Sequence, residues 1–580
     1  MSEVTPTTPE SRTRDAVQAI AADPSADVII VGGGINGIAT FRDLALQGVK
    51  VILVERDDFV AGASSASSHM IHGGIRYLEN GEFRLVRESV VERNALVKTA
   101  PHYVRPLPTT VPIFSTFSGI LSAPLRFLTH KQGKHTERGA LLIKVGLVIY
   151  DFFSRDGGAV PRHRFHGRTR TLSELPALND RVKYTATYFD ASMHDPERLA
   201  LDVLYDGLDA GDNARAANYL EAVGMGEGGL RVRDRVSGEE FDLTAPVIVN
   251  ASGPWTDLTN EQLGKPTTYM GGTKGSHIVL DNPELLEATG GREIFFEHED
   301  GRIVLIYPLK GRVMVGTTDL DHDMREPAVC TEDEIDYFFD LVGHVFPDIR
   351  VDREQIVYRF SGVRPLPRHD DTQPGFVSRD YRIEEAPAAG RPGTTVLSLV
   401  GGKWTTFRAL GEQLSDRVLE HLEHLGRSRT RSTQGLMIGG ALGYPRTQRA
   451  RSAWVSDHAD GRDHARVDQL LERYGTRAAA LIESLDDSDA PLVSLPDYST
   501  GEIRYLVETE YVVHLIDVLL RRTSVAFVGK TSLPALRELA DIAGDVLGWD
   551  AATREEEVAE TARILRERHG VELSEDSVLA

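Results

Sequence analysis

Residues 28–55 read VIIVGGGINGIATFRDLALQGVKVILVE, and this segment is the strongest indicator of the fold in the chain. An apolar strand runs into a glycine-rich turn, a helical segment follows, and a second apolar strand ends in Glu55. A strand, a G-x-G-x-x-G turn, a helix, a strand and an acidic residue form the pattern that binds an adenine dinucleotide. The sequence therefore predicts a Rossmann-type dinucleotide site near the N-terminus.

The positions of this turn have distinct physical tasks. Gly32 permits a tight turn, Gly34 lets the backbone approach a pyrophosphate, and Gly37 lets the helix pack closely on the strand. The helix N-terminus offers N–H donors and the positive end of its dipole to phosphates. The Glu55 carboxylate is expected to accept the ribose hydroxyls. The predicted dinucleotide contacts of this unit are Gly32, Gly34, Asn36, Gly37 and Glu55.

The composition is that of an ordinary globular protein. With 580 residues, 41% of them apolar and 26% charged, the chain should form two or three domains. The net charge of −22 argues against nucleic acid as a partner and means that an anionic ligand needs a locally basic pocket. The single cysteine, Cys330, excludes a disulfide framework and a cysteine-rich metal site and fits a reducing cytoplasm. The histidines match no metal-binding spacing, so no metal is predicted.

Neither the N-terminus nor any apolar run predicts a membrane-spanning or secretory segment. Residues 1–25 are rich in Thr, Ser and Pro and carry charges where a signal peptide is apolar, so we expect a disordered leader. The longest apolar run, at 141–153, contains Lys144 and Asp151 and is shorter than the roughly twenty residues that span a bilayer. It is expected to form a core helix or an interfacial helix.

Two later strands also open into glycine turns. Residues 245–250 lead into ASGPW, and residues 395–400 lead into GGKWTTFR. Three such transitions so far apart predict one sheet interrupted by inserted segments, which is typical of a large flavoprotein. Other patterns predict the strands of a second sheet at 276–280, 302–308 and 312–317. Helical patterns predict helices at 83–99, 331–346, 503–521 and 551–569.

Four stretches of the chain are characteristic when they occur together and in this order. They are VGGGINGIATFRDLALQG, SSASSHMIHGGIRYLE, YRFSGVRPL at 358–366 and GGKWTTFR. KGSHIVL at 274–280, GTTD at 316–319 and RYLVETEYVVHLIDVLLRRT at 504–523 add support. In these motifs the chain, from residue 27 to about residue 568, resembles the FAD-dependent, quinone-linked glycerol-3-phosphate dehydrogenase family and its relatives, the α-glycerophosphate oxidases.

The resemblance implies FAD as cofactor and oxidation of sn-glycerol 3-phosphate to dihydroxyacetone phosphate by hydride transfer to FAD. Electrons would pass to a membrane quinone, so that glycerol and glycerophospholipid catabolism feeds respiration. The implied location is the cytoplasm, with peripheral association at the inner face of the plasma membrane. The oligomeric state stays open, with a homodimer as one option.

The implied fold is α/β plus α. It consists of a glutathione-reductase-like FAD-binding Rossmann domain, an inserted antiparallel-sheet substrate domain and a C-terminal, mostly helical domain. The predicted parts are a leader at 1–25, an oxidoreductase region at 26–426 and a helical domain at 427–580. Within the oxidoreductase region, the FAD-binding segments are expected at about 26–115, 155–260 and 356–426, and the substrate sheet mainly at 261–355.

The resemblance also assigns substrate and catalytic residues. Arg76 and Arg364 match the phosphate-contacting positions of the family, with Tyr77 as a hydroxyl donor, and a planar guanidinium suits a phosphate dianion. His277 matches a position near the substrate and is the candidate base for the hydroxyl proton, although a structural histidine on a half-buried strand is the alternative. Lys403 follows two glycines at the start of a helix, where its charge would stabilise the anionic reduced flavin.

The remaining predicted cofactor contacts lie in the glycine turns and in the small-residue stretch after Glu55. They are Ser64, Ser65, Ser68, His72, Gly73, Gly74, Ser252, Gly253, Trp255, Gly402, Lys403, Thr405 and Thr406.

Two features depart from the family pattern. His69 stands where a Lys or Arg is usual, so a phosphate or flavin contact there would weaken or depend on pH. Residues 115–140 look longer than the equivalent bacterial segment and mix apolar side chains with Lys and Arg. That mixture suits docking on a membrane surface, while the alternative is a surface loop that packs its own apolar residues.

Three other functions stay open at this point. A soluble oxidase of the same fold would give its electrons to oxygen and produce hydrogen peroxide. A related amine or amino-acid oxidase would need one arginine for a carboxylate rather than a two-arginine phosphate site. An inactive FAD-binding scaffold or metabolite sensor would have no need of a phosphate clamp.

Overall fold

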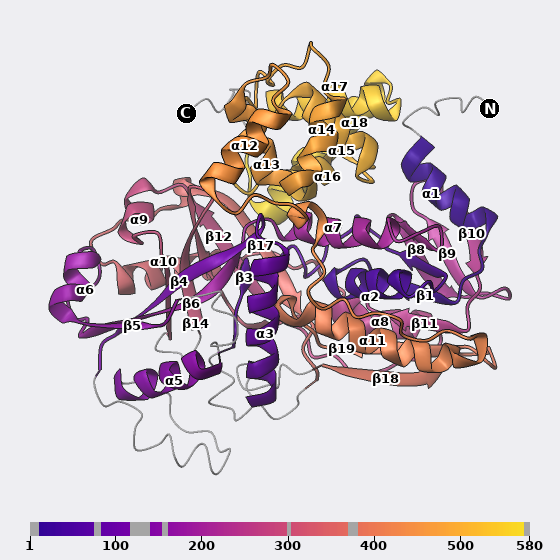
Figure 1. Ribbon diagram of the computed structural model, residues 1–580, viewed down its shortest axis with the longest axis horizontal. Coiled ribbons are helices and arrows are strands. Elements are labelled where there is room, and N and C mark those ends of the chain that lie inside the picture. The colour runs from indigo at the N-terminus through magenta and orange to yellow at the C-terminus, as the bar shows by residue number, and fades with distance from the viewer. Residues whose placement is uncertain are drawn as a thin grey trace.

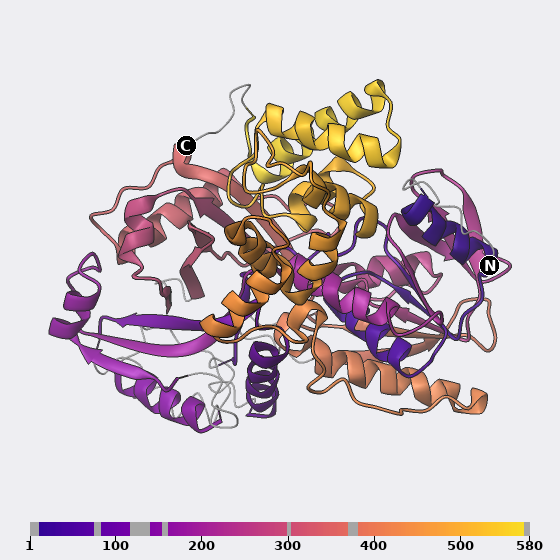
Figure 2. The same cartoon turned by 45° about the horizontal axis from the view of Figure 1, so that its top comes forward.

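The computed structural model describes residues 11–74, 83–115, 140–153, 161–297, 303–368 and 381–573. Figure 1 shows three parts, namely a six-stranded sheet with its helices on the right, a larger sheet on the left, and C-terminal helices above both. Figure 2 shows these helices lying over the junction between the two sheets. The site described below lies at this junction.

The dinucleotide unit forms the centre of the six-stranded sheet, whose order is β18-β19-β11-β1-β2-β7. Val28 of β1 pairs in parallel with Val51 of β2 on one side and with Val247 of β11 on the other. The prediction of one sheet interrupted by long insertions is therefore confirmed. The strands are β1 (Val28–Val31), β2 (Val51–Val54), β7 (Ala214–Ala217), β11 (Val247–Asn250), β19 (Thr395–Val400) and the antiparallel edge strand β18 (Arg382–Pro387).

Alternate residues of β1 enter two different cores, as expected for a strand buried on both faces. Val28 and Ile30 pack against α2 (Ile35–Leu46), α7 (Pro196–Leu208) and α11 (Phe407–Leu422). Ile29 and Val31 pack in a second core with α1 (Ser11–Ala22) and a three-stranded sheet. The strands of that sheet are β8 (Leu220–Met225), β9 (Leu230–Asp234) and β10 (Glu240–Leu243).

The expected disordered leader at 1–25 is wrong for the part that the structure describes. Residues Ser11–Ala22 form helix α1, which packs beside β7. Ile20 is fully buried, and Arg215 of β7 donates to the carbonyl oxygens of Ala19 and Asp23. The Thr- and Pro-rich start of the chain concealed the apolar pair Val17 and Ile20, whose burial offsets the loss of chain entropy.

The second sheet has ten strands, most of them antiparallel, with β13 and β4 parallel to each other. Its strands are β3 (Met70–Ile71), β4 (Val104–Ile113), β5 (Arg164–Gly167), β6 (Tyr184–Met193), β12 (Thr273–Leu280), β13 (Glu293–Glu297), β14 (Ile303–Leu309), β15 (Arg312–Gly316), β16 (Leu320–Asp321) and β17 (Ile356–Arg364). The strands expected at 276–280, 302–308 and 312–317 are confirmed as β12, β14 and β15.

The expectation that this sheet lies mainly within 261–355 is wrong. Five strands, β3, β4, β5, β6 and β17, come from segments that were assigned to FAD binding. The β4 segment reads VRPLPTTVPI, and its three prolines argue against a strand because proline has no N–H for the ladder. Successive prolines are two and four positions apart, so the positions without an N–H group all face the same side of the strand. Strand β4 therefore still pairs with β6 along its whole length.

Helices cover both faces of the second sheet. The expected helices at 83–99 and 331–346 are confirmed as α3 (Phe83–Thr99) and α10 (Glu332–Val345). The apolar run at 141–153 is helix α5 (Ala140–Phe153), which buries Leu147 and Tyr150 against α3 and β6. None of the helices in the described ranges has both the length and the apolar character needed to cross a bilayer. The short helices α6 (Arg168–Glu174) and α9 (Pro283–Ala288) also pack on this sheet, whereas α8 (Thr256–Gln262) packs on β8 and on β11 and β19 of the six-stranded sheet.

The C-terminal part is helical, as predicted. The helix expected at 551–569 is confirmed as α18, but the continuous helix expected at 503–521 is wrong. Helix α15 ends at Thr509, Tyr511 has a φ of +55°, and the chain restarts at Leu515, where Asp517 accepts from the His514 N–H. A π-helical turn, Val518–Arg522, follows. The helices are α12 (Gln448–His458), α13 (His464–Tyr474), α14 (Ala478–Ser484), α15 (Thr500–Thr509), α16 (Leu515–Asp517), α17 (Leu533–Leu547) and α18 (Ala551–His569).

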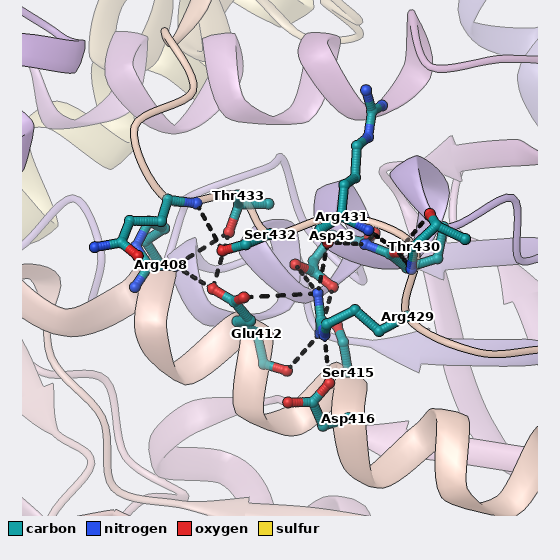
Figure 3. A network of polar contacts seen from close by, with 12 residues as sticks. Asp43, Arg408, Glu412, Ser415, Asp416, Arg429, Thr430, Arg431, Ser432 and Thr433 are labelled. Carbon is teal, nitrogen blue, oxygen red and sulfur yellow. Dashed lines mark hydrogen bonds and ion pairs between the residues drawn. The ribbon is translucent and has the colours of Figure 1, made fainter.

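Residues 427–433 connect helix α11 to the C-terminal helical part, and hydrogen bonds and ion pairs hold them on the six-stranded-sheet domain (Figure 3). Arg429 donates to both oxygens of Asp43 on α2, at 3.0 and 3.2 Å, and to the carbonyl oxygen of Glu412 on α11, at 3.0 Å. The side-chain oxygen of Gln47 accepts from the Thr430 and Arg431 N–H groups. The connection therefore contributes to packing and is not a free linker.

Candidate cofactor and substrate site

A cavity of about 910 Å³ lies at the junction of the two sheets and the C-terminal helices. Its wall includes nine of the predicted cofactor contacts. They are Gly32, Gly34, Asn36, Glu55, Ser64, Ser65, Ser252, Gly253 and Trp255. The ends of β1, β2 and β11 supply most of them, because these parallel strands end at the same edge of the sheet.

The Glu55 carboxylate is fixed by the backbone of its own turn. One oxygen accepts from the Gly33 N–H at 2.7 Å, and the other accepts from the Asp57 N–H at 2.9 Å. Burial raises the pKa of Glu55, and the two N–H donors oppose that shift. The carboxylate is thus oriented at the mouth of the glycine turn, where a ribose would be recognised.

Glycine is required at two positions of this turn. Gly32 has a φ of +113°, and a Cβ on Gly37 would stand 2.0 Å from the Gly32 carbonyl oxygen. The helix therefore starts directly against the strand end. Its Ile35 N–H donates to the Ser64 hydroxyl at 3.0 Å, so the small-residue stretch after Glu55 folds back over the helix N-terminus.

The GGKWTTF turn after β19 locks this small-residue stretch in place. The indole N–H of Trp404 donates to the Ser64 carbonyl oxygen at 2.9 Å, and the Thr405 hydroxyl donates to the His72 carbonyl oxygen at 3.2 Å. Lys403 donates to the buried Ser89 hydroxyl on α3 at 2.7 Å. The turn after β19 thereby organises a loop more than 300 residues away in the chain.

The described residues fit a bound dinucleotide in one further respect. The Asn36 side-chain oxygen and the Thr406 hydroxyl are buried and have no hydrogen-bond partner in the described part of the chain. Gly402, with a φ of +105°, lies so close that a Cβ there would stand 2.4 Å from the Asn36 side-chain nitrogen. Buried polar groups without partners are costly, so these two groups are candidates for ligand contacts.

His277 lies on β12, behind the cavity wall. Its Nε2 is 2.8 Å from the Ser68 hydroxyl, and its ring stacks on Phe360 of β17 with centroids 4.8 Å apart. A Cβ on Gly316 of β15 would stand 2.2 Å from the His277 ring, so the adjacent strand leaves room only for glycine. Burial first, and then the Arg364 charge, lowers the pKa of His277 to about 3.

Arg364 ends β17, and its guanidinium crosses β12. It donates to Asp319 at 2.9 Å, to the Thr317 hydroxyl at 3.0 Å and to the Thr318 carbonyl oxygen at 3.1 Å. A Cβ on Gly275 would stand 2.4 Å from its Nη2, so the glycine of KGSHIVL makes space for the guanidinium. Arg364 and His277 are thus held by neighbouring strands and share one electrostatic environment.

The structure does not bring every predicted residue to the cavity. Arg76 and Tyr77, and most of the 115–140 segment, lie outside the described residues. His69 is buried beside Phe527, and burial lowers its pKa to about 4, so it is neutral and provides no cation. His69 does line the cavity. The predicted site residues of the described ranges that are absent from the cavity wall are Gly37, Ser68, His72, Gly73, Gly74, His277, Arg364, Gly402, Lys403, Thr405 and Thr406.

Sequence reasoning missed the contribution of the C-terminal helices to the cavity. Arg521, Phe527 and His569 line it, together with Asp195 and Glu197 at the start of α7. The signal was present, because Arg521 belongs to the 504–523 motif, which served only to support the resemblance. A motif so far from the glycine turn gives no indication of where it packs.

Comparison with known proteins agrees with this geometry. Residues 27–417 match the family described as FAD dependent oxidoreductase, and residues 431–554 match the family described as C-terminal domain of alpha-glycerophosphate oxidase. The chain is 33% identical over 547 residues to glycerol-3-phosphate dehydrogenase of Synechocystis, covering 90% of this chain and 93% of that protein. It is 31% identical over 526 residues to D-erythritol 1-phosphate dehydrogenase of Brucella abortus, covering 87% and 95%.

The fold has a solved counterpart. The structure of glycerol-3-phosphate dehydrogenase from Bacillus halodurans complexed with FAD superposes with a TM-score of 0.71 at 22% identity, covering 99% of each chain. This likeness shows the fold, and the match of residues 27–417 to the FAD dependent oxidoreductase family assigns FAD as the cofactor. The chain belongs to the FAD-dependent glycerol-3-phosphate dehydrogenase and oxidase family.

Proposed function

We propose that the protein oxidises sn-glycerol 3-phosphate to dihydroxyacetone phosphate and passes the electrons to a membrane quinone. The observation that supports this proposal most strongly is the pairing of a neutral, buried imidazole with a guanidinium on the next strand. His277 and Arg364 provide a base and a phosphate ligand within one sheet, as oxidation of a phosphorylated secondary alcohol requires.

The chain's own residues have separate tasks in this reaction. When bound, FAD would supply the acceptor for the hydride that leaves the carbon bearing the hydroxyl group. His277 takes the hydroxyl proton on Nε2, which exchanges the Ser68 hydroxyl for the substrate. Arg364 binds the phosphate and is kept in place by Asp319 and Thr317, and Arg76 and Tyr77 are expected to complete the phosphate site. Lys403 would place a positive charge near the flavin and stabilise its reduced, anionic form.

The substrate is a polyol phosphate, and we infer glycerol 3-phosphate because it is the substrate named for the relative with 33% identity. The similarity to a D-erythritol 1-phosphate dehydrogenase makes a four-carbon polyol phosphate the second candidate. Steady-state rates with both phosphates, with unphosphorylated glycerol and with glycine decide between them. We expect the highest kcat/KM for sn-glycerol 3-phosphate. A higher value for erythritol phosphate, or activity with glycine alone, would overturn this assignment.

We propose a quinone rather than oxygen as the acceptor. Enzyme reduced by substrate without air should be reoxidised rapidly by a soluble quinone analogue and slowly by oxygen. Rapid reoxidation by oxygen with formation of hydrogen peroxide would identify an oxidase instead.

Access to a membrane quinone requires contact with the membrane, and we propose that residues 115–140 provide it at the inner face of the plasma membrane. Deletion of this segment should release the protein from sedimented liposomes that contain anionic lipid, while flavin reduction by substrate stays intact. Unchanged sedimentation of the deletion variant would contradict this proposal.

A further inference from the structure

The 504–523 motif has no task in the proposed reaction, yet it reaches the loop that follows the cofactor-binding Glu55. The motif contacts Asp58, which lies three residues after Glu55. Asp58 is fully buried and lines the cavity. Asp58 accepts from Arg522 at 2.6 and 2.9 Å, and Arg521 donates to it as well. Its remaining bonds come from the Phe59 N–H and the Asn218 side chain, both at 2.8 Å. We call Asp58, Arg521 and Arg522 the Asp58 cluster.

The π-helical turn explains how two consecutive arginines reach one carboxylate. Neighbouring residues of an α-helix point in different directions, whereas the wider turn at Val518–Arg522 directs both guanidinium groups at Asp58. Figure 1 shows α16, which leads into this turn, above α7, and the turn itself contacts α7. Such turns occur often at functional sites.

Both arginines are held from the C-terminal side. Arg521 donates to Asp517 at 2.5 Å, and Asp517 in turn accepts from the Tyr219 hydroxyl at 2.7 Å. Arg522 donates to the Glu510 carbonyl oxygen at 2.8 Å. The C-terminal domain therefore presents two oriented cations, and Asp58 is the anion that they fix.

The same loop sets the orientation of Glu55. The Asp57 N–H, adjacent to Asp58, donates to the Glu55 carboxylate at 2.9 Å. The Glu55 and Asp57 carbonyl oxygens accept from the Leu220 and Tyr219 N–H groups, at 2.8 and 3.0 Å. Tyr219 has a φ of +53°, an unfavourable conformation that persists because its hydroxyl and backbone are both bonded.

A buried cluster of this kind is a poor means of gaining stability alone. Burial opposes the charge of Asp58, and the charges of Arg522 and then Arg521 lower its pKa to about 2, so it stays ionised. Apolar side chains of similar size often stabilise a protein as well as a buried ion pair does, whereas an ion pair fixes geometry. The geometry fixed here is that of the loop next to the ribose site.

We propose that the Asp58 cluster is a positioning device through which the C-terminal domain holds Glu55 in place for the adenosine ribose of FAD. The FAD site is then shared between two domains, and retention of the cofactor depends on the contact of Arg521 and Arg522 with Asp58. This inference rests on the use of FAD in the proposed function and on the ribose-binding role that the dinucleotide motif predicts for Glu55. Asp58 acts through Glu55 and does not itself touch the cofactor.

The test is the rate at which holoenzyme releases FAD after dilution, followed by the rise in flavin fluorescence. Glu55→Gln, Asp58→Asn and the double variant form a cycle. We expect each single variant to release FAD about tenfold faster or more, and the double variant to release it no faster than Glu55→Gln. Multiplicative effects in the double variant would overturn the proposal, because Asp58 would then act independently of Glu55.

Asp58→Asn removes the negative charge that pairs with the buried Arg521 and Arg522. This variant can be used in the cycle only if its holoenzyme folds. Arg522→Lys keeps the charge but loses the two-pronged contact with Asp58, so it should release FAD faster than wild type and more slowly than Asp58→Asn. If Asp58→Asn does not fold, Arg522→Lys replaces it in the cycle with Glu55→Gln.

Arg477→Gln is the matched control. Arg477 also joins the C-terminal domain to α7, through Asp206 at 3.0 Å, but it does not line the cavity. We expect a lower melting temperature and an unchanged release rate. Equal acceleration by Arg477→Gln would show that loosened docking alone releases FAD and would overturn the role of Asp58.

Substrate takes no part in this measurement, so a failure of the substrate assignment does not affect it. If Glu55→Gln releases FAD at the wild-type rate, the ribose role of Glu55 fails and the positioning proposal fails with it. If Glu55→Gln accelerates release and Asp58→Asn does not, only the positioning proposal fails.

Discussion

At the scale of single residues, the environment of His277 determines whether it can act as a base. An imidazole with a pKa of about 3 is neutral across the physiological range, but it is a weak base, because an efficient catalytic base has a pKa near the working pH. The cost appears in folding. Below the ordinary histidine pKa of about 6.5, the unfolded chain binds a proton that the folded chain does not, so His277 makes the folded state less stable as pH falls toward 3.

Two measurements follow for His277. Hydrogen–deuterium exchange at the imidazole C2 position of substrate-free enzyme should report a pKa well below the ordinary value. His277→Asn should lower the rate of flavin reduction by about 10²- to 10⁴-fold and leave bound FAD in place. A pKa at or above about 6.5 would contradict the burial of the imidazole, and a nearly normal reduction rate would assign His277 a structural role only.

Gly275 is the residue-scale test of the Arg364 site. Gly275→Ala places a methyl group 2.4 Å from the present position of Arg364 Nη2, so the guanidinium must move. Loss of a hydrogen bond between charged groups predicts that kcat/KM for the phosphorylated substrate falls by about ten- to a hundredfold. Gly343→Ala on α10 is the control, since no heavy atom lies within 4 Å of its added Cβ. Equal kinetics for both variants would exclude Arg364 from substrate binding.

At the scale of elements, the GGKWTTF turn joins the cofactor loop to α3. Lys403→Ala removes a charge from this turn while the contacts of Trp404 and Thr405 to the loop remain. We expect the rate of flavin reduction to fall about 10²-fold with an unchanged fold, as measured by rapid mixing without oxygen. Ser89→Ala removes a partner of Lys403 but keeps the charge, and it should retain nearly the wild-type rate. A normal rate for Lys403→Ala would contradict an electrostatic role.

Elements with strong local patterns could be predicted from the sequence, and elements set by distant contacts could not. The glycine turn, β12 and α18 follow from apolar periodicity and glycine placement. Strand β4 was missed because its prolines mask a long pairing with β6. Helix 503–521 was predicted as continuous because its apolar pattern carries no sign of the break at Tyr511, which serves the packing of Asp517 and Arg521.

The same division holds for the site. The contacts around Gly32 and Glu55 are local and follow from the motif. The nearness of His277 to Arg364 depends on the pairing of β12 with β17, two strands about eighty residues apart in the chain. The arrival of Arg521 and Arg522 at Asp58 joins positions more than 460 residues apart.

At the scale of the whole molecule, the connection between the halves is part of the packing. Arg429 joins it to Asp43, which is almost completely buried on α2. Removal of one partner leaves a buried charge uncompensated, so Arg429→Ala should lower the melting temperature by several degrees. The double variant with Asp43→Asn should regain part of the loss, as measured by thermal unfolding. An unchanged melting temperature for Arg429→Ala would show that the contact of Arg429 with Asp43 does not contribute to the stability of the folded protein.

Anaerobic mixing of the holoenzyme with sn-glycerol 3-phosphate shows whether this chain uses FAD to oxidise a glycerol phosphate. We expect rapid bleaching of the flavin absorbance with wild type and about a 10²-fold or greater slowing with His277→Asn. Absence of bleaching in protein that holds FAD would contradict the assignment of Arg364 and His277 to substrate and would direct attention to other alcohols and amines.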